Sequence, residues 1–209
     1  MTDKTDIFMT GVGGQGSLSA STALGEAATR AGLKVLVGEI HRMAQRGGVV
    51  ESTVRIGNVH GPIIPDGHAD LLLGFEPVES WRALHKASPK TMVITNTHPI
   101  VPATVSMKGD DYPDPDFVVA QIRAFCPNTM AIDATEIAKE AGNPRAMNTV
   151  LLGVVAGTGI LPFDAEILRA VVLANVPQKT IEANERAFDR GLEIGGQQAG
   201  GPPFRIAGG

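Results

Sequence analysis

The sequence predicts an α/β protein of Rossmann-like type, with a doubly wound, mostly parallel sheet and helices on both faces. Three observations favour this fold class. Short apolar segments of strand character alternate with longer segments whose apolar residues recur at helical spacing. The first apolar segment runs directly into a glycine-rich turn and then a helical pattern. The 209 residues, 43% hydrophobic and 19% charged, suffice for one sizeable core.

The N-terminal part predicts a strand, a glycine turn, a helix and a second strand. Residues 7–12 have strand character, and a helical pattern begins at Ser17 and ends at Gly32, which suits a left-handed cap. Residues 34–40 follow as the second strand. A unit of this kind, within about 35 residues, predicts that the two strands form a parallel pair.

The later elements are expected in alternation along one domain, residues 1–194. They are a strand at 49–57, a strand at 71–75, a helix at 77–86, a strand at 91–96, a helix at 116–125, a strand at 130–134, a helix at 134–141, a closely packed glycine-containing helix at 147–157, a helix capped by Asp164 and a last helix from Pro177. Residues 99–111 fit either a loop or short edge strands. Residues 195–209 predict a flexible tail rich in Gly and Pro.

Composition excludes several classes of function. The net charge of −4 and the aromatic content of 4% give no basis for binding nucleic acid. The single cysteine, Cys126, cannot form an intrachain disulfide or hold an iron–sulfur cluster. The longest apolar stretch, residues 150–161, is too short to span a bilayer, and the N-terminus does not resemble a signal peptide. We expect a cytoplasmic protein without a membrane partner.

The glycine turn is the first candidate site. Its segment Gly11-Val12-Gly13-Gly14-Gln15-Gly16 fits the pattern G-x-G-x-x-G, and Ser17 opens the helix. Glycines allow close approach of a phosphate, and the helix start offers unpaired amides. Glu39 lies 23 residues after Gly16, where such folds place a ribose-binding acid. Tight packing without a ligand is the alternative, and Gln15 is large enough to fill part of the site.

A second polar segment follows the second predicted strand. It contains His41, Arg42, Gln45, Arg46 and the pair Gly47-Gly48. Arginine forks suit phosphate or carboxylate, and a double glycine indicates a backbone constraint. This segment is expected beside the glycine turn; a solvated basic turn is the alternative. Asn148 is either a helix cap or a residue facing the site. No histidine has metal-ligand spacing, so no metal site is predicted, and the catalytic residues stay unknown.

Together these segments resemble a known family. The sequences GVGGQGSLSAS, GEIHRMAQRGGVVESTVRIG, ADLLLGFEPVES and NTVLLGVVAG occur in the order found in the gamma-type domain of the 2-oxoacid:ferredoxin oxidoreductases. The similarity is greatest to the small (beta) subunit of indolepyruvate ferredoxin oxidoreductase and covers residues 5–190. Arg42, Glu51 and Thr53 depart from the residues usual in the family. The resemblance therefore leaves the particular 2-oxoacid open.

The resemblance implies a non-cofactor subunit that is inactive alone. A larger partner subunit would hold thiamine diphosphate, Mg²⁺ and [4Fe–4S] clusters, and ferredoxin would accept the electrons. This chain would complete the active site and bind CoA or a related nucleotide. The binding residues it implies are Gly11, Gly13, Gly14, Gln15, Gly16, Ser17, Glu39, Arg46, Gly47, Gly48 and Asn148. A stand-alone NAD(P)-dependent oxidoreductase or a nucleotide-binding regulatory module are the alternatives.

Overall fold

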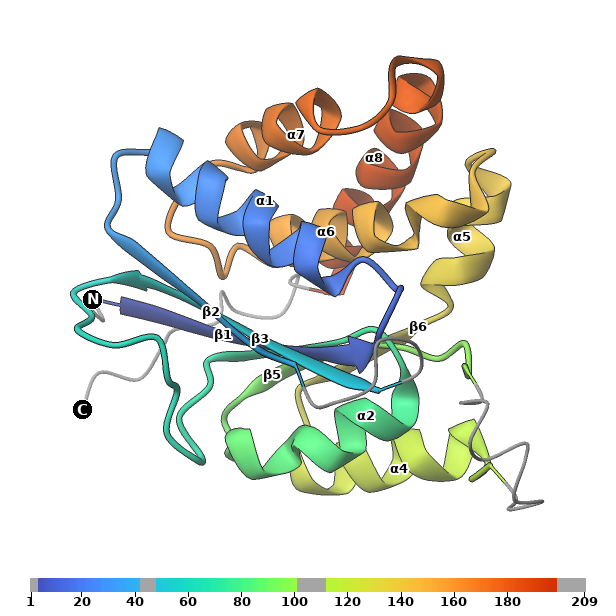
Figure 1. Ribbon diagram of the computed structural model, residues 1–209. Coiled ribbons are helices and arrows are strands. Elements are labelled where there is room, and N and C mark those ends of the chain that lie inside the picture. Colours follow the sequence, from blue (N-terminus) through green and yellow to red (C-terminus); the bar gives the residue numbers. More distant parts are fainter. Residues whose placement is uncertain (1–3, 42–47, 101–111, 199–209) are drawn as a thin grey trace.

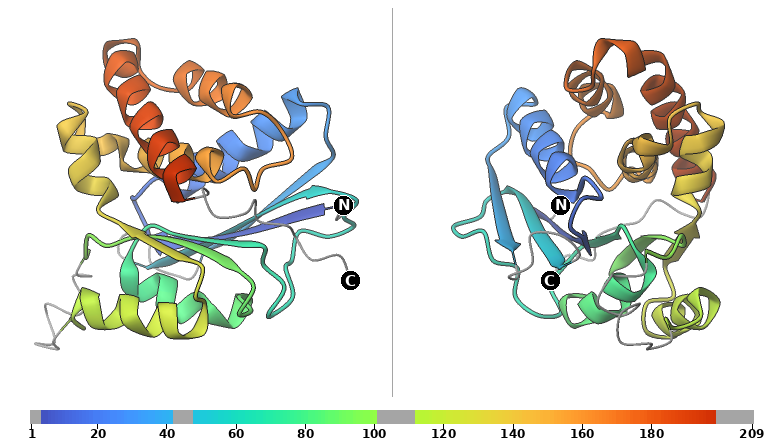
Figure 2. Two further views of the ribbon diagram at one scale, coloured as in Figure 1. Left: turned by 180° about the vertical axis from the view of Figure 1, so that it is seen from behind. Right: turned by 45° about the vertical axis from the view of Figure 1, so that its right-hand side comes forward.

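The computed structural model describes residues 4–41, 48–100 and 112–198, which form a sheet covered by helices on both faces (Figures 1 and 2). The described strands form one six-stranded sheet in the order β2-β3-β1-β4-β5-β6. Their bounds are β1 Lys4–Val12, β2 Val35–His41, β3 Val49–Gly57, β4 Leu71–Gly74, β5 Met92–Asn96 and β6 Thr129–Ile132. The predicted fold class is confirmed.

Seven α-helices lie within the described residues. They are α1 Ser17–Arg30, α2 Pro77–Arg82, α4 Pro115–Phe125, α5 Ala134–Glu140, α6 Met147–Gly157, α7 Ala165–Ala174 and α8 Ile181–Gln198. Three short 3₁₀ segments join them, namely η1 Ala83–Lys86, η2 Pro144–Ala146 and η3 Gln178–Thr180. Most predicted elements agree with these bounds within one or two residues. The undecided stretch 99–111 lies almost wholly outside the described residues.

The predicted parallel pairing of the first two strands is wrong, because β3 lies between them and runs antiparallel to both. The pairing of β3 with β1 extends from Lys4 opposite Gly57 to Val12 opposite Val49. The Arg55 guanidinium donates to the buried Asp6 carboxylate, with Nε 2.7 Å from Oδ1, so this cross-strand pair fixes the register. Strands β1, β4, β5 and β6 are mutually parallel.

Two apolar cores lie on opposite faces of the sheet. Ile7 and Met9 of β1 belong to the core under α1 and α5–α8, whereas Phe8 belongs to the core under α2 and α4. This alternation follows from the two-residue period of a strand. Figure 1 shows the two helical layers, with α2 and α4 below the sheet. Because both faces are covered, ligands are expected at the ends of the strands.

The glycines of α6 and α8 let these helices meet backbone to backbone. A Cβ on Gly153 would lie 2.2 Å from the Phe188 carbonyl oxygen, and one on Gly195 would lie 2.3 Å from the Val154 carbonyl oxygen. The predicted close packing of residues 147–157 is therefore confirmed. The predicted start of the tail at residue 195 falls inside α8, because Gly195 is buried against α6.

Asp164 occupies the N-cap position of α7, as predicted, but its side chain makes no capping hydrogen bond. None of the helices in the described ranges combines the length and apolar character that a membrane span requires.

Candidate functional site at the first strand-to-helix turn

The turn between β1 and α1 is built from glycines in left-handed conformations. Gly14 has φ of 100° and Gly16 has φ of 84°, which L side chains rarely adopt. Gly16 is the N-cap residue of α1, and no side chain caps this end. The first-turn amides of α1, beginning at Ser17, have no partner within the helix. Together with the helix dipole they favour a bound anion.

The side chain of Gln15 stabilises this turn through two hydrogen bonds. Its Oε1 accepts a hydrogen bond from the Val12 amide, and its Nε2 donates to the Phe75 carbonyl oxygen at 2.9 Å. The side chain therefore links the end of β1 to the end of β4 and does not cover the start of α1.

A cavity of about 540 Å³ lies against the glycine turn. Gly13, Gly14, Gln15 and Gly16 form one wall. Opposite them are residues after β5 and β6 and around the start of α6, including His98, Thr135, Arg145 and Asn148. Of the described residues lining this cavity, none is Asp or Glu. Its volume lies in the range of small-ligand sites.

Asn148 faces this site, which decides between the two predicted roles. The N-cap of α6 is Ala146, and Asn148 lies in the first turn of the helix. A Cβ on Gly16 would lie 3.0 Å from its Nδ2, so the amide group contacts the glycine turn directly. Its Oδ1 accepts from the Thr149 amide at 3.0 Å, which leaves Nδ2 oriented as the donor toward the turn.

The second predicted segment is only partly described. Gly48 lies beside the glycine turn, because its carbonyl oxygen accepts from the Gly13 amide at 2.9 Å. Arg42, Gln45, Arg46 and Gly47 lie outside the described residues. Glu39 lies exposed on edge strand β2, with β3 between that strand and β1, and it does not line the cavity.

Two of the three residues that depart from the family pattern lie within the described part of the chain, and both are on β3. Thr53 is buried on β3, and its hydroxyl donates to the Pro62 carbonyl oxygen at 2.7 Å. Glu51 is also buried on β3, and its charge raises the pKa of Glu79, although burial of Glu79 is the larger cause. Both departures therefore affect the interior beside β3.

The neighbouring turn, between β4 and α2, is closed by a carboxylate. Glu76 is the N-cap of α2, and its Oε2 accepts from the Glu79 amide at 2.8 Å. The side chain is buried, and its Oε1 has no hydrogen-bond partner among the described residues. Burial raises the pKa of Glu76 to about 7, against the lowering effect of the backbone hydrogen bonds.

Sequence reasoning missed the three polar residues of the opposite wall, apart from Asn148: His98, Thr135 and Arg145. His98 follows β5 and Thr135 follows β6, so both lie at the carboxyl edge of parallel strands. The rule that ligands bind at this edge would have identified them. Arg145 carries no such signal, because a 3₁₀ turn before α6 brings it to the site. Within the described ranges, no group of three His, Cys, Asp or Glu is arranged to hold a metal.

This geometry defines a cavity at the carboxyl edge of an α/β sheet, beside the uncapped start of α1. The family model described as Pyruvate ferredoxin/flavodoxin oxidoreductase matches residues 6–194. The chain belongs to this family. The predicted class, a gamma-type subunit of a 2-oxoacid:ferredoxin oxidoreductase complex, is confirmed.

Individual relatives agree with this assignment. The indolepyruvate oxidoreductase subunit IorB of Methanothermobacter thermautotrophicus is 42% identical over 187 residues, which cover 90% of this chain and 95% of that protein. IorB of Thermococcus kodakarensis is 43% identical over 197 residues, covering 93% and 98%. The crystal structure of pyruvate oxidoreductase subunit PORC from Thermotoga maritima matches with a TM-score of 0.65 at 28% identity, covering 92% of this chain and 97% of that one.

Proposed function

We propose that this chain is the non-cofactor subunit of a cytoplasmic, thiamine-diphosphate-dependent oxidoreductase that acts on indolepyruvate or another arylpyruvate. The proposal rests on three relatives above 40% identity, all of them indolepyruvate oxidoreductase subunits. The reaction class is oxidative decarboxylation of the 2-oxoacid to an acyl-CoA, with ferredoxin as electron acceptor. The chain works within a complex and is inactive alone.

The redox groups belong to a larger partner subunit in this proposal. A [4Fe–4S] cluster needs four ligands of cysteine type, and this chain has one cysteine. That residue, Cys126, is buried, and burial raises the pKa of its thiol, which disfavours a metal-binding thiolate. The partner therefore supplies thiamine diphosphate, Mg²⁺ and the clusters, and this chain forms one wall of the active site.

The role of this chain is to bind CoA, or a related nucleotide, at the glycine turn. CoA supplies the thiol that accepts the acyl group. The observation that carries this role is the uncapped start of α1, which faces a cavity lined by the glycine turn and without carboxylates among the described residues. The amides of Gly14, Gly16 and Ser17 would hold a phosphate, with Asn148 as a further donor. The amides of Gly13 and Gln15 already donate to carbonyl oxygens of the chain.

Residues of the second segment complete the proposed site. Gly48 lies next to the glycine turn through its hydrogen bond with Gly13. In the proposed site, Gly47 would allow the chain to approach the ligand, and Arg46 would add a guanidinium to the phosphate. Because Glu39 does not line the cavity, its proposed part is to orient Arg46 and not to contact the ligand. Arg145, which lines the cavity, adds a further positive charge.

Gly13→Val tests this role in the assembled enzyme. The new side chain enters the proposed phosphate path, so we expect the KM for CoA to rise by about tenfold or more. Gly61→Val is the matched control, because a Cβ at Gly61 meets nothing within 4 Å. Unchanged CoA kinetics in Gly13→Val would exclude the proposed role of the turn.

Purification of the chain from its host under anaerobic conditions tests the proposed partner subunit and its cofactors. We expect co-purification with a larger subunit that contains iron, sulfide and thiamine diphosphate. A chain that purifies alone with bound NAD would instead support the stand-alone oxidoreductase.

A further inference from the structure

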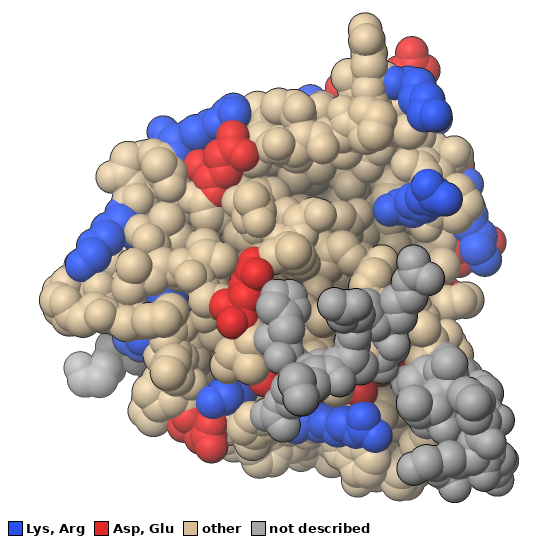
Figure 3. Space-filling model, viewed as in Figure 1, with Lys and Arg blue, Asp and Glu red and all other residues tan. Residues whose placement is uncertain are grey.

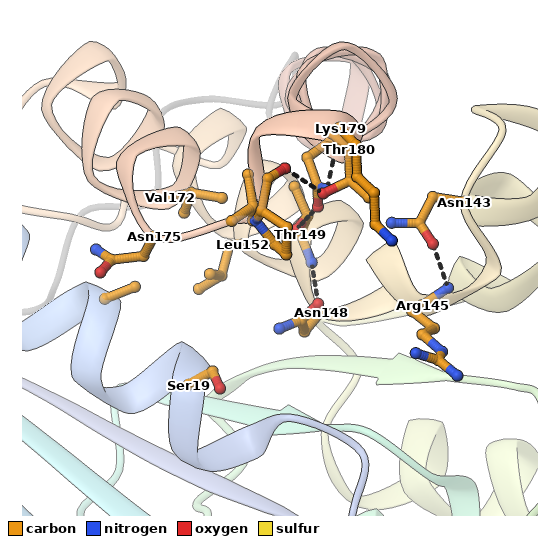
Figure 4. A pocket seen from close by; sticks show the side chains of 14 residues that line it. Ser19, Asn143, Arg145, Asn148, Thr149, Leu152, Val172, Asn175, Lys179 and Thr180 are labelled. Carbon is orange, nitrogen blue, oxygen red and sulfur yellow. Dashed lines mark hydrogen bonds between the residues drawn. The ribbon is translucent and has the colours of Figure 1, made fainter.

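A second cavity, of about 500 Å³, lies directly beside the cavity at the glycine turn. It is enclosed by α1, α6, α7, η3 and the start of α8 (Figure 4). The two cavities share Arg145 and Asn148 as lining residues. A ligand with one group at the glycine turn can therefore reach the second cavity by passing these two side chains.

The second cavity has a positively charged end and an uncharged end. Figure 4 shows Asn143, Arg145 and Lys179 at one end, and Leu152 and Val172 with Asn175 at the other. In the space-filling view, the surface above α1 is hollowed and mostly neutral, with Lys and Arg side chains along its right-hand border (Figure 3). This division suits a ligand that joins a charged group to a flat apolar one.

The electrostatics of the cavity favour an anion. Arg145 and Lys179 are both exposed, and none of the fourteen described lining residues is Asp or Glu. The first turns of α1 and α6 contribute Ser19 and Asn148 to its wall, so two helix dipoles point their positive ends toward it. Glu26 contacts the lining residue Asn175, with its Oε2 accepting from Nδ2 at 3.0 Å.

Buried polar groups hold the wall of this cavity in place. Thr149 is 2% exposed and Asn184 is 3% exposed. The Thr149 hydroxyl donates to Asn184 Oδ1 at 2.7 Å, and Asn184 Nδ2 donates to the Thr180 carbonyl oxygen at 2.9 Å. This network ties α6 to the start of α8, and it fixes the positions of Asn148 and Lys179 on either side.

We propose that the second cavity binds the phosphorylated nucleoside end of the nucleotide whose diphosphate lies at the glycine turn. The ribose phosphate lies at the end formed by Arg145 and Lys179, and the base lies against Leu152 and Val172. For CoA this group is the 3′-phosphate, which dephospho-CoA lacks. The inference rests on the proposed function, because it requires a nucleotide at the glycine turn.

Lys179→Ala tests the proposal in the assembled enzyme, with CoA and dephospho-CoA as alternative substrates. The measured quantity is the preference for CoA, given by the ratio of the two kcat/KM values. Because Lys179 is exposed, we expect the variant to lower this preference by about threefold to tenfold. Lys90→Ala is the matched control. Lys90 is an exposed lysine that precedes β5, so it lies at the amino ends of the parallel strands, whereas the cavity at the glycine turn lies at their carboxyl ends.

Three outcomes separate this inference from the proposed function. A reduced CoA preference in Lys179→Ala, but not in Lys90→Ala, supports the subsite. An unchanged preference, with a strong CoA defect in Gly13→Val, overturns the subsite and leaves the proposed function intact. Normal CoA kinetics in both Gly13→Val and Lys179→Ala overturn the proposed function and, with it, the subsite.

Inorganic phosphate distinguishes the nucleotide from a free anion. If the ribose phosphate occupies the cavity, phosphate competes with CoA more strongly than with dephospho-CoA. Binding of phosphate that depends on Lys179 but does not compete with CoA would identify a free ion as the occupant, and would overturn the assignment.

Discussion

Two neighbouring strand-to-helix turns lie at the same edge of the sheet, but they differ in whether a side chain caps the helix that follows. The turn from β1 to α1 ends in Gly16 and leaves the amides of α1 open to a cavity. The turn from β4 to α2 ends in Glu76, whose carboxylate caps α2 from within the protein. The comparison shows that the fold alone does not leave a helix start uncapped. The residue at the N-cap decides whether the chain or a ligand satisfies the helix start.

The largest expected effect concerns the closed turn. The Glu76 carboxyl loses its proton near pH 4.5 in the unfolded chain and near pH 7 in the folded one. Between these values the folded state binds more protons, so the free energy of unfolding falls as pH rises, by about 3 kcal/mol in total. Below pH 4.5 both states are protonated and the cost is absent.

Glu76→Gln should remove this pH dependence, because the amide does not ionise. Denaturant unfolding of the chain between pH 4.5 and 8 measures it, with the exposed Glu140→Gln as control. Equal pH slopes in wild type and Glu76→Gln would show that the Glu76 carboxyl ionises normally.

The next largest effect is expected from a substitution that converts the open turn into a closed one. Gly16→Asp places a carboxylate at the N-cap of α1, where it competes with a ligand phosphate for the same amides. Asp and Asn both tolerate positive φ, so Gly16→Asn controls for shape without charge. We expect Asp to weaken CoA binding about tenfold relative to Asn. Equal binding by the two variants would contradict an anion at this turn.

The smallest effect concerns the residue that joins the two turns. Gln15→Leu removes the hydrogen bonds to the Val12 amide and the Phe75 carbonyl oxygen. Asn96 Nδ2 still donates to the Phe75 oxygen, so we expect a loss of only about 1 kcal/mol in the free energy of unfolding. The exposed Gln121→Leu on α4 serves as control in thermal unfolding. A stability equal to that of the control would mean that the turn holds its shape without Gln15.

The sequence predicted the secondary-structure elements better than it predicted which strands lie next to one another in the sheet. Periodicity identified β3 as a strand, but its position between β1 and β2 depends on long-range pairing, including the contact of Arg55 with Asp6. The glycine turn was predicted because its conformation is encoded locally. On the opposite wall, His98 follows β5 and could have been found from the rule that ligands bind at the carboxyl edge of parallel strands. Arg145 could not, since it reaches the site only through a 3₁₀ turn before α6.

The close contact of α6 with α8 has a consequence for how the chain is made. Asn148 at the glycine turn sits on α6, and α6 is held by the glycines of α8 as far as Gly195. During synthesis, residues near 195 leave the ribosome long after the turn at residues 11–16 has emerged. A nascent chain therefore carries the glycine sequence early, whereas the helix that carries Asn148 gains its packing partner α8 only near the end of translation.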